Sequence, residues 1–208
     1  RSKMRFFHIS DLHFGKLLYG YDLTEEHRNF IEQLGDYCDK YNPDAVLIAG
    51  DVYDRSVPSA DAMTLLDELL NKLSGRKVFI ISGNHDNAKR LSFGKDFLKK
   101  HDIYISTVPQ TGENEKIEKV TFADEYGNVN IYMLPFLKPA LFKNSMPEEA
   151  AAGEDAIIKK LVENTDIDKN ERNIILAHQF FVSGHKEPEF CESEQTPAIV
   201  GGLDAVDV

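Results

Sequence analysis

Four short apolar segments of the chain each end in polar side chains, and this pattern constrains the fold more than any other sequence feature. The segments cover residues 4–9, 45–49, 77–81 and 173–177. A continuous apolar run of this length is typical of a strand that is covered on both faces. The polar residues that follow the four segments are Asp11, His13, Asp51, Asn84, His85, Asp86 and His178.

Segments with helical spacing alternate with these strands. We expect helices over residues 24–41, 59–73, 88–100 and 156–162, a further strand over 103–105, and a hairpin formed by 116–123 and 128–134. Strands that alternate with helices predict an α/β fold, and the hairpin indicates a layered, mixed β-sheet flanked by helices. We expect one domain over residues 1–208, incomplete at its C-terminal end, because residues 188–208 are loop-like and stop without a domain-ending signal.

Composition narrows the function classes only in part. The net charge of −11 is a poor match to nucleic-acid binding, but several carboxylates have the positions of metal ligands, and bound dications would neutralise them locally. The chain has no apolar run of about eighteen residues, so no membrane span is expected. Two distant cysteines, Cys38 and Cys191, without metal-ligand spacing favour a reducing compartment, and we expect the cytoplasm.

The polar clusters are placed to meet in one cleft. Ligand sites of open α/β sheets form at the carboxyl ends of strands, and adjacent strands lie about 4.8 Å apart. Carboxylate, imidazole and amide oxygen together suit manganese, iron or zinc, and Asp51 could bridge two cations roughly 3.5–4 Å apart. An imidazole at His85 could assist the leaving oxygen, and Asp86, next to it, could orient it through a hydrogen bond.

Each of these residues also has a plainer interpretation. Asp11, Asp51 and Asn84 could cap turns, and a lone histidine such as His178 after an apolar run is usually a core residue. The occurrence of four such clusters at four strand ends favours the ligand interpretation. Tyr19, Tyr21 and Arg55 could contact DNA near the cleft, and a purely structural role fits them equally well.

The motifs at these strand ends resemble the signature of the calcineurin-like metallophosphoesterase family. They are DLH at 11–13, GDVYDR at 50–55, GNHD at 83–86 and His178, in this order along the chain. The resemblance implies that Asp11, His13 and Asp51 bind a first metal ion, that Asp51, Asn84 and His178 bind a second, and that His85 is the catalytic histidine.

A narrower resemblance, to the SbcD family of bacterial nuclease subunits, covers nearly the whole chain. It rests on LYGYDL at 18–23, YDRSVP at 53–58, LPF at 134–136 and VGGLDAVD at 200–207. It implies a manganese-dependent double-strand exonuclease and single-strand endonuclease, with Mg²⁺, Fe²⁺ or Zn²⁺ as other possible cations. The implied partners are DNA, the SbcC coiled-coil ATPase and a second copy of the chain, as in the related repair nucleases of archaea and eukaryotes.

The sequence departs from this pattern at two points. The Gly-His-x-His motif that completes the family's metal site is absent, and Gly184-His185 does not replace it. Position 54 is aspartate, where archaeal relatives carry histidine. Two other functions therefore stay open: a small-molecule phosphatase or cyclic-nucleotide phosphodiesterase on the same core, and an inactive, truncated interaction module.

Overall fold

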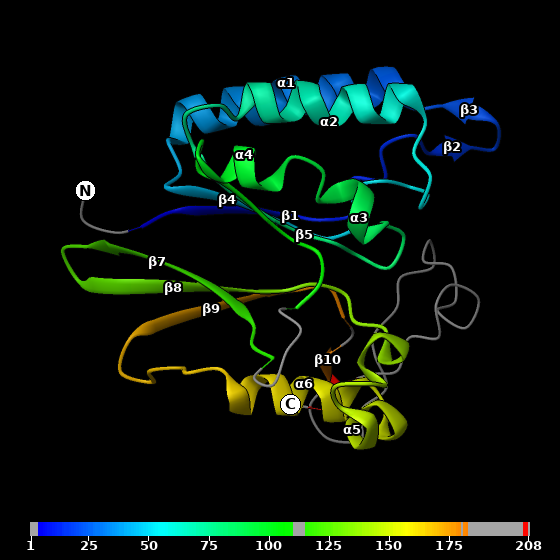
Figure 1. Cartoon of the computed structure of the whole chain (residues 1–208). Coiled ribbons are helices and arrows are strands. Elements are labelled where there is room, and N and C mark those ends of the chain that lie inside the picture. The colour runs from blue at the N-terminus through cyan, green and yellow to red at the C-terminus, as the bar shows by residue number, and fades with distance from the viewer. Residues whose placement is uncertain (1–3, 110–114, 180, 183–205, 208) are drawn as a thin grey trace.

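The computed structural model describes residues 4–109, 115–179, 181–182 and 206–207, and it has four layers: helices, a sheet, a second sheet and further helices (Figure 1). The first sheet has four parallel strands in the order β1-β4-β5-β6. The second has three strands in the order β7-β8-β9, with β7 and β8 antiparallel and β9 parallel to β8. Their bounds are Phe6–Ile9 (β1), Ala45–Ala49 (β4), Lys77–Ile81 (β5), Ile103–Ser106 (β6), Glu118–Asp124 (β7), Gly127–Leu134 (β8) and Arg172–Ala177 (β9).

The expected α/β class is confirmed, but the strands form two stacked sheets, and only the second one is mixed. Apolar side chains of both sheets meet in one core, in which Leu47 and Phe79 of the first sheet belong to the same cluster as Ile131 and Met133 of the second. The strand β4 is fully buried because the second sheet covers one of its faces and helices cover the other. This arrangement explains its uninterrupted apolar sequence.

Helices cover the outer face of each sheet (Figure 1). The long helices α1 (Thr24–Tyr41) and α2 (Ala60–Lys72) pack on the first sheet, and α6 (Glu154–Asn164) packs on the second with α5 (Pro147–Ala152) and the 3₁₀ helix η1 (Pro139–Phe142). The expected helix over 88–100 is instead two short helices, α3 (Ala88–Leu91) and α4 (Lys95–Lys99). Gly94 separates them, because its φ of 73° is not helical.

Two small strand pairs complete the described structure. The strands β2 (Leu17–Leu18) and β3 (Tyr21–Asp22) form a short antiparallel hairpin, and β10 (Phe181–Val182) pairs in parallel with β11 (Val206–Asp207). Residues 1–3, Gly184, His185, Cys191 and positions 200–205 of the SbcD-like motif lie outside the described residues. Cys38 is buried with a free thiol, and across the described ranges no helix combines the length and apolarity needed to cross a membrane.

The topology brings the two sheets together at the site. All four strands of the first sheet run in parallel, so that the loops after β1, β4 and β5 emerge at one edge. The second sheet meets this edge where the N–H of Phe136, after β8, donates to the carbonyl of Ser82, after β5, at 2.9 Å. His178 directly follows β9, so it comes from the second sheet and not from a neighbouring strand of the first.

Candidate metal centre

The loops after β1 and β4 are joined by backbone hydrogen bonds. The N–H of Asp11 donates to the carbonyl of Gly50 (3.1 Å), and the N–H of His13 donates to the carbonyl of Asp51 (3.0 Å). Asp11, His13 and Asp51 all have left-handed backbones, with φ values of 57°, 46° and 48°. This conformation costs a non-glycine residue roughly 1–2 kcal/mol, and such strain concentrates at functional sites. The chain therefore accepts strain at three of the expected ligands.

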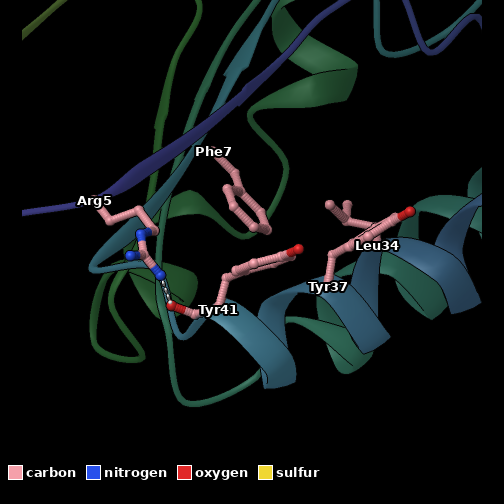
Figure 2. Close-up of a pocket in the computed structure, with 5 residues that line it drawn as sticks. All are labelled: Arg5, Phe7, Leu34, Tyr37 and Tyr41. Atoms are coloured by element: carbon pink, nitrogen blue, oxygen red, sulfur yellow. Dashed lines mark hydrogen bonds between the residues drawn. The ribbon is translucent and has the colours of Figure 1, made fainter.

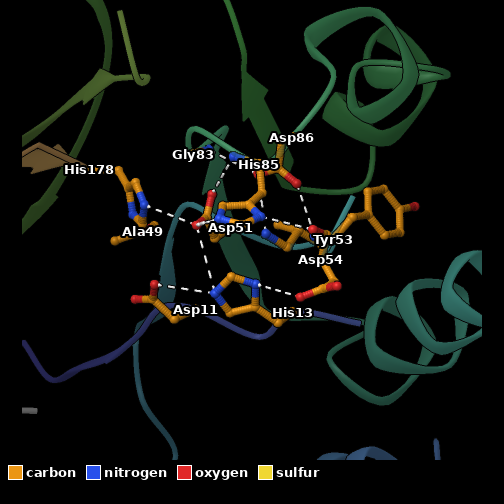
Figure 3. A network of polar contacts seen from close by, with 11 residues as sticks. Asp11, His13, Ala49, Asp51, Tyr53, Asp54, Gly83, His85, Asp86 and His178 are labelled. Carbon is orange, nitrogen blue, oxygen red and sulfur yellow. Dashed lines mark hydrogen bonds and ion pairs between the residues drawn. The ribbon is translucent and has the colours of Figure 1, made fainter. Parts of the chain in front are cut away.

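The carboxylate of Asp51 lies at the centre of the site (Figure 3). Its side chain is only 4% exposed. One oxygen, Oδ1, accepts a hydrogen bond from the N–H of His85 at 3.0 Å. The other, Oδ2, faces three imidazoles, with the Nε2 atoms of His178, His13 and His85 at 3.5, 3.7 and 3.9 Å.

The same three imidazoles have oxygen neighbours at their Nδ1 atoms. Nδ1 of His178 lies 2.6 Å from the carbonyl oxygen of Ala49, and Nδ1 of His85 lies 2.8 Å from the carbonyl oxygen of Asp54. In His13 the neighbour is the carboxylate Oδ1 of Asp54, at 3.3 Å. A carbonyl only accepts hydrogen bonds, so Nδ1 of His178 and of His85 must carry the proton. In the neutral rings Nε2 is then the unprotonated nitrogen and faces Asp51. This is the form in which His178 could bind a metal ion, whereas His85 could take up a proton at Nε2.

The spacing of these atoms fits bound cations better than it fits direct hydrogen bonds. Two donors bound to one cation at about 2.0–2.2 Å stand roughly 3.0–3.6 Å apart. The contact from Asp51 Oδ2 to His178, at 3.5 Å, lies in this range, and those to His13 and His85, at 3.7 and 3.9 Å, are slightly longer. Donor atoms of Asp11, Asp51 and His178 lie within 4.8 Å of one another, and so do those of His13, Asp51 and His85. Asp51 belongs to both groups, as a bridging ligand would.

This grouping differs from the expected division of ligands, in which His13 shares a cation with Asp11. Oδ1 of Asp11 lies 3.7 Å from Nε2 of His13, although the two residues fall into different groups. The side chains thus surround one continuous space. Which residue binds which cation stays a prediction.

The electrostatics of the site favour cations. The neighbouring His13 side chain lowers the pKa of Asp11 to about 2. Burial opposes ionisation of Asp51, but the interaction with His178 and the backbone N–H of His85 outweigh burial and lower its pKa. Burial also opposes a charge on His178, whereas Asp51 favours it, and the net pKa is raised. The lowered pKa values favour ionised carboxylates at Asp11 and Asp51, and Asp51 in turn favours the protonated form of His178. A bound dication would replace that proton.

Two glycines leave room for this arrangement. A Cβ atom at Gly50 would lie 2.5 Å from the ring of His178, and one at Gly83 would lie 2.0 Å from Oδ1 of Asp51. Both contacts are closer than real Cβ atoms allow. The glycines of the two motifs therefore permit His178 and Asp51 to approach the backbone.

Asp86 does not orient His85, contrary to our expectation. Its carboxylate is buried and accepts hydrogen bonds from the backbone N–H groups of Val52 (3.1 Å), Tyr53 (2.9 Å) and Gly83 (2.9 Å). Burial raises its pKa against these hydrogen bonds. Asp86 joins the loop after β5 to the loop after β4, because both loops present backbone donors to its carboxylate. The group that contacts the His85 ring is instead the carbonyl of Asp54.

Four predicted residues lie outside this network of contacts. Asn84 is half-buried in the loop between Gly83 and His85, and its role as a ligand stays a prediction. Tyr19, at the tip of the β2–β3 hairpin, is fully exposed, and Tyr21 donates from its hydroxyl to Glu26 at 3.2 Å. The side chain of Arg55 is 70% exposed, and its Nε lies 3.7 Å from Oδ2 of Asp54.

An open hollow of about 560 Å³ lies at the opposite end of the first sheet (Figure 2). Arg5, just before β1, and Tyr41, at the end of α1, place it at the amino-terminal end of the strands, away from the metal centre. The guanidinium of Arg5 donates to the carbonyl of Tyr41 at 2.6 Å. The lining side chains carry neither carboxylate nor imidazole, so they lack the donors of the metal centre; they are Arg5, Phe7, Leu34, Tyr37 and Tyr41.

Comparison with known proteins agrees with this geometry. The model of the calcineurin-like phosphoesterase family matches residues 4–202, which include every strand and helix that forms the site. The chain belongs to the calcineurin-like phosphoesterase family. This family implies divalent cations, and the carboxylates and imidazoles around Asp51 are suitable ligands for them.

A curated member of this family is similar over nearly the whole chain. The SbcD subunit of the nuclease SbcCD from Staphylococcus epidermidis (strain ATCC 12228 / FDA PCI 1200) is 29% identical over 210 residues. The match covers 99% of this chain and 53% of the relative, so the chain spans about half the length of the protein that it resembles.

Sequence reasoning missed two groups that position the histidines: the carbonyl of Ala49 and the residue Asp54. No residue type signals the role of a carbonyl. Asp54 did carry a signal, since it follows Asp51 by three residues in the same loop.

Proposed function

We propose that the protein hydrolyses phosphodiester bonds of DNA, as the nuclease domain of an SbcD-like double-strand exonuclease and single-strand endonuclease. One observation supports the hydrolytic part above all: the buried Asp51 carboxylate, which faces three imidazoles where the ends of the two sheets meet. The family match supports hydrolysis of a phosphoester. The choice of DNA rests on the SbcD relative and on the motifs around Tyr19 and Tyr21.

The residues have distinct roles in this proposal. When bound, a pair of divalent cations (Mn²⁺ first, with Mg²⁺, Fe²⁺ or Zn²⁺ as alternatives) would supply a nucleophilic water and polarise the phosphoryl oxygens. Five side chains would hold them, namely Asp11, His13, Asp51, Asn84 and His178. The imidazole of His85, whose Nδ1 is fixed by the carbonyl of Asp54, would in its protonated form give a proton from Nε2 to the leaving oxygen.

Exposed groups near the centre would contact the nucleic acid. Tyr19 and Tyr21 are exposed on the β2–β3 hairpin, which begins four residues after His13, and Arg55 is exposed beside Asp54. Aromatic rings stack on bases, and a guanidinium pairs with phosphate. Bound dications would offset part of the net charge of −11, which otherwise opposes DNA binding.

The proposed assembly follows the relative. We propose that a coiled-coil ATPase of the SbcC type is the partner, that the protein works in the cytoplasm, and that it forms a homodimer through its early helices. Exposed apolar side chains support an interface on these helices: Met63 on α2 is 54% exposed, and Phe97 on α4 is 65% exposed.

A small-molecule phosphatase or cyclic-nucleotide phosphodiesterase on the same core is the main alternative, because fold and metals do not determine the substrate. Assays of the longer parent protein with Mn²⁺ separate the two. We expect cleavage of linear duplex DNA and of single-stranded circles, with slow turnover of bis-p-nitrophenyl phosphate. Asp51→Asn is the control that should abolish all three. Rapid turnover of the small substrate or of cyclic nucleotides with no DNA cleavage would refute the nuclease assignment.

A further inference from the structure

The three histidines around Asp51 differ in one chemical respect. His178 and His85 have a backbone carbonyl at Nδ1, which can only accept a hydrogen bond. His13 has instead a side-chain carboxylate, that of Asp54. The group at Nδ1 of His13 therefore depends on the identity of a side chain, whereas the group at Nδ1 of the other two belongs to the backbone.

Asp54 is held firmly in the loop after β4. Its N–H donates to the carbonyl of Phe14 at 3.1 Å, in a small parallel bridge that also joins Phe14 to Tyr53. Its side chain is 19% exposed, with Oδ1 toward His13 and Oδ2 3.7 Å from Nε of Arg55. One residue thus contacts two histidines: its carboxylate lies at His13, and its carbonyl lies at His85.

We propose that Asp54 is a positioning residue, whose carboxylate accepts the Nδ1 proton of His13 and so keeps the Nε2 lone pair of His13 directed at the cation site. The role in metal binding rests on the proposed function, because it assumes that His13 binds a cation. The choice of His13 tautomer does not rest on it. Neutral imidazole carries one proton, and a carboxylate beside Nδ1 selects the tautomer that leaves Nε2 free.

Asp54 does not take the place of a ligand itself. Nδ1 and Nε2 lie on opposite sides of the imidazole, and Asp51 and Asp11 lie at Nε2 while Asp54 lies at Nδ1. The His13 ring therefore separates the Asp54 carboxylate from the Asp51 carboxylate (Figure 3). The Asp54 contact, at 3.3 Å, is longer than the usual N–H···O distance of about 2.9 Å, and in the structure the buried Nδ1 of His13 makes no hydrogen bond. We expect it to shorten when a cation fixes Nε2.

The variants Asp54→Asn and Asp54→Ala test the proposal in the metal-free chain labelled with ¹⁵N-histidine. Long-range ¹H–¹⁵N spectra, recorded about two pH units above the ordinary imidazole pKa of roughly 6.5, report which ring nitrogen carries the proton. We expect His13 to be protonated at Nδ1 in the unsubstituted chain and to shift toward Nε2 in Asp54→Ala, whereas the amide oxygen of Asp54→Asn still accepts a hydrogen bond and should keep the Nδ1 tautomer. His85 should not change, because both variants keep the backbone carbonyl at position 54, and His85 is thus an internal control.

Calorimetric titration with Mn²⁺ of the longer parent protein that carries the same substitutions gives the second measurement. Loss of such a partner typically weakens metal binding 10–100-fold, and we expect this loss in Asp54→Ala and a smaller one in Asp54→Asn. The exposed Asp36 on α1 gives the matched control, since Asp36→Asn removes the same charge at a residue that interacts with Lys72 of α2 and is not part of the site. Thermal unfolding shows whether each variant is folded.

Three outcomes would overturn the proposal: an unchanged His13 tautomer in Asp54→Ala, a changed tautomer in that variant with unchanged Mn²⁺ affinity, or an equal loss of affinity in Asp36→Asn. The tautomer is measured without metal, substrate or turnover. A protein that fails to cleave DNA but shows the tautomer shift would therefore refute the proposed function and leave the positioning role intact.

Discussion

Asp51 is the residue on which the site depends. Burying a carboxylate costs several kcal/mol unless it has partners, and here one oxygen has a backbone donor while the other faces only imidazole nitrogens at 3.5 Å or more. The Asp51 carboxylate favours the protonated form of His178, and it raises the pKa of His178 against the effect of burial. A cation shared by these groups would compensate more fully. At the scale of single residues, the site is thus built for positive charge.

Asp86 gives a prediction that separates structure from chemistry. Replacing it by Asn puts an amide N–H₂ group among three backbone donors, so we expect the free energy of unfolding to fall by about 2–3 kcal/mol. Urea unfolding measures this change. The exposed Asp36→Asn should shift stability by less than about 0.5 kcal/mol. Full stability of Asp86→Asn combined with lost turnover would restore a catalytic role.

His85 gives the opposite expectation. His85→Ala removes the proton donor while leaving Asp11, Asp51 and His178 in place, so we expect turnover of DNA by the parent protein to fall roughly 10²–10⁴-fold and Mn²⁺ affinity to change little. Steady-state cleavage assays and calorimetry on the same preparations measure the two quantities. Equal losses in both would identify His85 as a ligand or a scaffold residue.

At the scale of elements, the site is formed by strand ends that can approach one another closely because glycines follow β4 and β5. Gly50 has a φ of 84°, and a Cβ there would meet the ring of His178 at 2.5 Å. Gly75 has nearly the same φ, 80°, but open space around it. We expect Gly75→Ala to cost stability through backbone strain alone, roughly 1–2 kcal/mol, and to leave Mn²⁺ affinity unchanged.

Gly50→Ala should cost more and should also displace His178, weakening Mn²⁺ binding. Urea unfolding and Mn²⁺ titration of both variants test this pair. Equal effects of the two substitutions on stability, with metal affinity unchanged in both, would show that the close approach of His178 to Gly50 does not matter.

The elements themselves were largely predictable. The strands β4 and β5 and the helix α1 begin and end where the sequence indicates, at residues 45–49, 77–81 and 24–41, because apolar runs and helical spacing report burial directly. The elements η1 and α5 were missed, since short helices leave little periodicity. The division into two sheets was missed too, because an apolar run shows that a strand is covered and not which sheet it joins.

The site was predictable in its members but not in its details. Strand ends gather polar side chains, and so Asp11, His13, Asp51, His85 and His178 were expected together. The direction of a side chain was harder to infer: adjacency placed Asp86 at His85, whereas its carboxylate turns back to backbone donors. Contacts made by backbone carbonyls, such as that of Ala49 with His178, cannot be predicted from the residue type, because every residue has a carbonyl.

At the scale of the whole molecule, the site draws on both sheets, so its geometry depends on their packing as well as on its own residues. The 208 residues contain no Gly-His-x-His motif, which the resemblance to the SbcD family implies as the source of one further ligand for each cation. We therefore expect this segment alone to bind Mn²⁺ weakly, particularly as a pair, and to have little nuclease activity. Calorimetry that shows two tight Mn²⁺ sites in the segment would contradict this.

The most direct test is the position of bound manganese in the longer parent protein, located by anomalous scattering from a crystal grown with Mn²⁺. We predict two peaks about 3.5–4 Å apart, on either side of the Asp51 carboxylate and within bonding distance of His13 and His178. Manganese bound only elsewhere, with no peak in contact with Asp51, would contradict a metal centre built around this carboxylate.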